Sequence, residues 1–147
     1  MATIDTAVNA IHLLFAGLWA GSVIFVAFGV LPTARDGGFD AGPLTDLIGR
    51  FRLGSRIASL VLFLTGGHLA AARYTSETLV GSSRGHLVIG MVLLWLALTG
   101  LVEVGSGRLA DGLNNRQVRG PARNATPFFQ AASVAAIGLL VLGGILL

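Results

Sequence analysis

The residues of this sequence best suited to chemistry are its three histidines, His12, His68 and His86. Each lies in a long apolar run, where an ionisable side chain is costly and normally faces the interior of a helix bundle. Neutral imidazole binds copper, zinc, iron and nickel, and two imidazoles on opposed helices can form the axial pair of a b-type haem. The alternative is that each histidine only hydrogen-bonds a neighbouring helix.

Several other chemistries are excluded by residue type. Cysteine is absent and all ten basic residues are arginine, so thiolate metal sites, Schiff-base lysines and P-loop lysines cannot form. No paired carboxylates, serine–histidine–acid set or phosphate-binding loop can be assembled, so an enzyme is the less favoured class. The net charge of +3 comes from arginines between apolar runs, which indicates membrane topology and no nucleic-acid partner.

The histidines are positioned by four apolar segments. The chain has 147 residues, 54% hydrophobic and 12% charged, with a mean hydropathy of +0.80. Soluble domains carry about 25% charged residues, and a membrane-spanning helix needs about 20 mainly apolar residues. We therefore predict one all-α domain over 1–147, an integral membrane four-helix bundle with spans at 6–31, 51–73, 85–104 and 127–147.

The arginine distribution predicts how this bundle is oriented. Eight arginines lie in or beside the first and third connections, whereas Arg73 and Arg84 alone flank the second connection, and neither terminus carries a basic residue. Because cytoplasmic loops are enriched in arginine and lysine, both termini and the second connection should be extracytoplasmic. The predicted location is the cell membrane, with several passes.

The three histidines should lie at one depth. His12 is about six residues into the first span, His68 is five residues before Arg73, and His86 is two residues after Arg84. At about 1.5 Å per residue, these positions are about 3–9 Å below the outer face. A shared layer drawn from three helices predicts one metal site near that face.

Neighbouring residues suggest how the imidazoles are oriented. Asn9 precedes His12 by one turn, and Trp19 follows it on the same helix face. Thr65 likewise precedes His68 by one turn. We therefore predict that three residues orient the imidazoles without binding the metal themselves: Asn9, Trp19 and Thr65.

A family resemblance points the same way. The motifs in question are Ile11-His12-Leu13-Leu14, Gly17-Leu18-Trp19-Ala20-Gly21, Arg50-Phe51-Arg52, Thr65-Gly66 and Asn115-Arg116. In order and over nearly the whole chain, they resemble the four-helix core of the CopD-like copper-resistance membrane proteins. The resemblance implies copper binding or uptake at the outer face, with His12 as the residue carried over.

A more distant likeness is to the four-helix haem-binding membrane proteins of the HemJ type. They also place histidines in the first helix and at the start of the third. The lysines of that family are missing here, which argues against its oxidase activity but not against haem. In this alternative two of the three histidines are axial ligands of haem b, and Arg73 or Arg84 lies near the propionates.

The sequence thus favours a membrane copper-binding or copper-transport protein with His12, His68 and His86 as ligands. A b-type haem protein for electron transfer or a redox subunit is the second hypothesis, and a structural subunit of a membrane complex is the third. Expected partners are membrane lipid and a periplasmic or extracellular copper donor or redox protein, with homo-oligomerisation as a further option.

Overall fold

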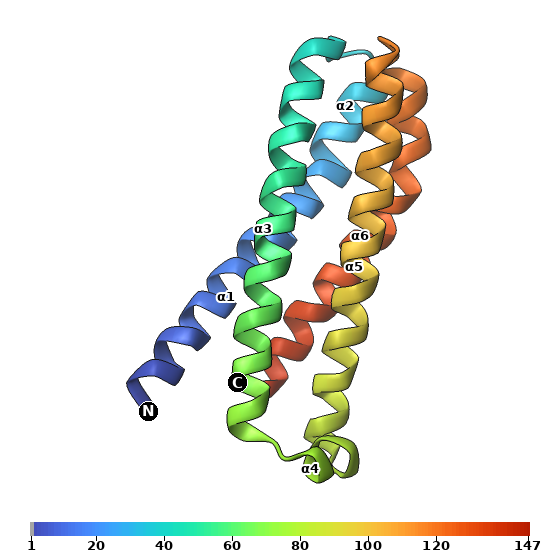
Figure 1. Cartoon of the computed structure of the whole chain (residues 1–147). Coiled ribbons are helices and arrows are strands. Elements are labelled where there is room, and N and C mark those ends of the chain that lie inside the picture. Colours follow the sequence, from blue (N-terminus) through green and yellow to red (C-terminus); the bar gives the residue numbers. More distant parts are fainter. Residues whose placement is uncertain (1) are drawn as a thin grey trace.

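The computed structural model describes residues 2–147, and within that range every element is a helix (Figure 1). The first long segment consists of α1 (Ala2–Phe25), the π-helical turn η1 (Val26–Val30) and α2 (Leu31–Arg35). The remaining helices are α3 (Ala41–Arg73), α4 (Ser76–Gly81), α5 (Ser83–Asn114) and α6 (Arg119–Leu146). The helical content of residues 2–147 confirms the all-α class. The long segments alternate in direction along the bundle.

Three of the long helical segments are apolar and long enough to cross a membrane. They are Ala2–Arg35, Ser83–Asn114 and Arg119–Leu146. Large apolar side chains such as Leu14 and Leu93 are exposed on them, as expected where a helix faces lipid. These features indicate a membrane protein.

Two prolines lie within continuous helical segments, Pro32 within Ala2–Arg35 and Pro127 within α6. The predicted spans stop at 31 and begin at 127, next to Pro32 and Pro127, but the helices continue through both positions. The π-helical turn η1 ends two residues before Pro32, and its altered hydrogen-bond pattern accommodates the bond that proline cannot donate. At Pro127 the helix is preserved, and the preceding Thr126 hydroxyl donates to the Ala122 carbonyl at 2.8 Å.

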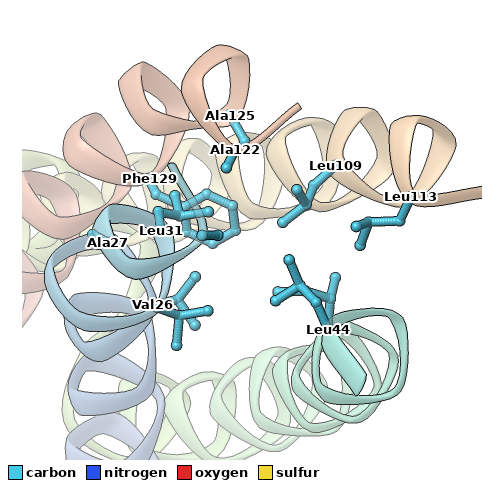
Figure 2. Close-up of a cluster of buried hydrophobic side chains, with 12 residues drawn as sticks. Val26, Ala27, Leu31, Leu44, Leu109, Leu113, Ala122, Ala125 and Phe129 are labelled. Carbon is cyan, nitrogen blue, oxygen red and sulfur yellow. The ribbon is translucent and has the colours of Figure 1, made fainter. Parts of the chain in front are cut away.

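The core lies in two clusters, one at the arginine-rich end and one in the middle of the bundle. In the first cluster, Leu31, Leu44, Leu109 and Phe129 point from α2, α3, α5 and α6 into one space (Figure 2). The second cluster consists of Trp19, Ala20, Val23, Ala58, Leu62, Leu98, Val102, Ala132, Ala135 and Ala136. The arginine-rich end is therefore closely packed and fixes the relative position of the long helices.

The opposite end of the bundle is packed more loosely. None of the α1 residues from Ala2 to Leu18 is fully buried, and α6 has no fully buried residue after Ala136. In Figure 1 the first turns of α1 diverge from α5. All three histidines belong to this open end.

Candidate functional site

His12 lies at the interface of α1 and α3. Its half-buried imidazole rests against Gly66, where an added Cβ would lie 3.1 Å from His12 Cε1. A larger residue at position 66 would therefore push the ring away. The Nδ1 atom of His12 is 2.7 Å from the hydroxyl oxygen of Thr65.

The hydrogen bonds of Thr65 indicate one tautomer of His12. The Thr65 hydroxyl donates its only hydrogen to the Val61 carbonyl at 2.7 Å. With that hydrogen on the Val61 carbonyl, the Thr65 oxygen accepts from Nδ1–H of His12. In the neutral ring Nε2 consequently keeps its lone pair, and this is the atom that can bind a metal.

His68 contacts the same pair of helices, closer to the chain terminus of α1. Its Nε2 atom is 3.0 Å from a carboxylate oxygen of Asp5, across the interface between α3 and α1. When Nε2–H donates to this carboxylate, Nδ1 of a neutral His68 keeps a lone pair. Each imidazole on the α1–α3 interface is thus hydrogen-bonded through one of its ring nitrogens, which is common among metal-binding histidines.

His86 occupies a different part of the open end. Its exposed imidazole contacts the Val80 carbonyl oxygen through Nε2 at 2.6 Å, so it joins the start of α5 to α4. Within residues 2–147 no group of three or more histidine, aspartate or glutamate side chains lies close enough to hold one metal ion. The structure therefore groups His12 and His68 on one interface and places His86 on another.

The predicted supporting residues also separate. Thr65 contacts His12 and not its helix neighbour His68. Trp19 is buried in the central core cluster, where its indole N–H donates to the Ser55 hydroxyl at 2.7 Å. Asn9 is half-buried on α1, and Arg73 and Arg84 are exposed at the end of α3 and the start of α5.

Sequence reasoning missed a charge cluster between α3 and α5. Arg52 donates from Nε and Nη2 to Glu103 Oε2, at 3.3 and 3.1 Å. Arg56 donates from Nε to Oε1 at 2.8 Å and from Nη2 to Oε2 at 3.1 Å. The available signal was the four-residue spacing of the arginines, which puts them on one helix face, together with a lone acid in the apolar run of α5.

Comparison of the chain with models of known protein families, with curated protein sequences and with solved structures gives no match.

Proposed function

We propose that the chain is an integral membrane metal-binding protein of the CopD-like type that binds copper near the outer face. The observation that carries the proposal is the 2.7 Å contact between the Thr65 hydroxyl and Nδ1 of His12, which leaves the other ring nitrogen, Nε2, as the ligand atom. Imidazole nitrogen is a good ligand for copper. His12 is thus the principal ligand in this proposal.

His68 is the second proposed ligand, because Asp5 holds one of its nitrogens as Thr65 holds one of His12. His86 is the third, and it would have to exchange its contact with the Val80 carbonyl for the metal. Its ligand role is therefore the most easily replaced by water. Transfer of the ion inward through the bundle is the transport part of the proposal.

The proposed topology has four spans, with both termini and the connection between α3 and α5 outside the cell. Its support is the placement of eight arginines at one end of the bundle and only Arg73 and Arg84 at the other. On α3, the exposed side chains Ile57, Leu60 and Leu64 give this helix an outward apolar face as well. A cell-membrane protein with four passes accounts for both features.

Single cysteines should report this topology, because the native chain contains none. Ser83→Cys and Gln117→Cys are suitable positions, since both residues are exposed at opposite ends of the bundle. In intact cells a membrane-impermeant maleimide should label the cysteine at 83, and the cysteine at 117 only after lysis. The reverse pattern would invert the orientation, and labelling of both in intact cells would rule out this four-span arrangement.

Copper content should depend on the three histidines in a fixed order. After loading with copper and dialysis, His12→Ala should abolish stoichiometric binding, His68→Ala should weaken it strongly, and His86→Ala should only shift the affinity. Elemental analysis of the purified variants measures the copper-to-protein ratio. Full copper in all three variants would show that the histidines serve helix packing alone.

Thr65→Val gives a finer test, because it keeps the side-chain shape and removes the hydroxyl that orients His12. Copper affinity should fall about 10–100-fold, as is usual when a residue that orients a metal-binding histidine is lost. Thr99→Val on α5 is the matched control.

A Soret band in the purified protein would instead support the haem hypothesis. In that case two of the three histidine-to-alanine variants should lose the low-spin spectrum and the third should keep it.

A further inference from the structure

A cleft of about 280 Å³ opens between α3 and α5, next to the charge cluster of Arg52, Arg56 and Glu103. It extends along α3 from Arg56 to Phe63, a distance of about 10 Å at 1.5 Å per residue. One end is charged and the other is aromatic. None of the histidines lines the cleft, and the cleft plays no part in the proposed copper site.

The charged end carries one net positive charge, because two guanidinium groups meet a single carboxylate. Each guanidinium has five N–H donors, and the bonds to Glu103 use two donors of Arg52 and two of Arg56. The side chain of Arg56 is 58% exposed, so its outer edge is accessible. This end matches a singly charged anion, and guanidinium matches phosphate oxygens in particular.

The other end offers an apolar wall. The rings of Phe63 and Trp95 stack with centroids 5.4 Å apart, and Leu60 is exposed beside them. The indole N–H of Trp95 donates to the Ser59 carbonyl at 3.1 Å, which fixes the ring as a wall of the cleft. Hydroxyls in the cleft are also satisfied, since Ser59 and Thr99 bond to each other at 3.1 Å.

We propose that this cleft binds one membrane phospholipid with a net negative headgroup. Its phosphodiester contacts Arg56 and Arg52, and one acyl chain lies along Leu60, Phe63 and Trp95. The charge balance selects an anionic lipid over a zwitterionic one, because only the anionic headgroup neutralises the cluster. The inference rests on the membrane location of the chain and is independent of copper binding.

Native mass spectrometry of the full chain in detergent tests the selectivity. Phosphatidylglycerol and phosphatidylcholine with identical acyl chains are added in equal amounts, and one phosphatidylglycerol should be retained preferentially. Arg56→Gln should lower this preference about tenfold, the effect of losing one charge-assisted hydrogen bond. Arg50→Gln removes an exposed arginine of the same helix outside the cleft and should leave the preference intact.

Fluorescence quenching tests the location. In phosphatidylcholine vesicles with a small fraction of brominated lipid, brominated phosphatidylglycerol should quench tryptophan more strongly than brominated phosphatidylcholine. Trp95→Phe should remove this difference, because the remaining Trp19 is buried in the core. Equal quenching by both lipids, or equal loss of selectivity in the Arg50 and Arg56 variants, would overturn the proposal. Neither outcome bears on copper binding, so the lipid proposal and the copper proposal can be refuted independently.

Discussion

Replacing Phe129 by alanine should destabilise the protein more than any other single truncation in the core. Its ring is completely buried in the cluster at the arginine-rich end and lies 5.8 Å from the ring of Phe51, centroid to centroid. In lipid the transfer of apolar surface from water contributes little, so the cavity and the lost van der Waals contacts carry the effect. We expect a loss of about 3 kcal/mol, at the lower end of the range for phenylalanine truncations.

Reversible unfolding in mixed micelles, followed by helical circular dichroism as the denaturing detergent is increased, measures this loss. Phe28→Ala is the matched control, because Phe28 is 62% exposed on the π-helical turn of the same bundle. Its unfolding free energy should change by less than about 0.5 kcal/mol. Similar losses in the two variants would show that the cluster in Figure 2 is not the principal core.

Gly112→Ala is expected to have the second large effect, by overpacking. A Cβ at position 112 would overlap Cγ of Pro121 and lie 2.6 Å from its Cβ, and Pro121 is buried at the start of α6. A proline ring cannot rotate away, so α5 and α6 would have to separate. The Gly112 carbonyl also accepts the N–H groups of Asn115 and Gln117, so the turn between these helices would move with it.

Overpacking of this kind typically costs about 1–3 kcal/mol, measured by the same unfolding assay. Gly100→Ala on the same helix is the control, since its added Cβ meets nothing within 4 Å. That variant should be unchanged or more stable by up to about 1 kcal/mol, because alanine favours the helix. If both alanines behave alike, α5 and α6 are not in contact at Gly112.

The helices could be predicted from the sequence because long apolar runs have few structures available to them in lipid. Their ends could not be placed, since Pro32 and Pro127 look like boundaries in one dimension. The structure accommodates Pro32 with a π-helical turn and keeps Pro127 inside α6. Local residue preferences do not reveal such compensations.

Counting residues predicts that the histidines lie towards one end of the bundle, but it does not predict the direction in which each side chain faces. His12 faces α3 and His86 faces α4 because of how the helices are rotated and packed. The pairing of Arg52 with Glu103 joins residues far apart in sequence, so it depends on the register of α3 against α5. Packing across the whole bundle sets this register, so a short sequence motif cannot predict it.

The uneven distribution of buried residues gives the molecule a gradient of local stability. Amide hydrogen exchange should be slowest near Leu109 and Phe129 and much faster in the first four turns of α1, where no side chain is fully buried. In those turns the hydrogen bonds from His12 to Thr65 and from His68 to Asp5 join α1 to α3. Local opening of α1 would therefore break the contacts of both imidazoles while the core at the arginine-rich end stayed closed.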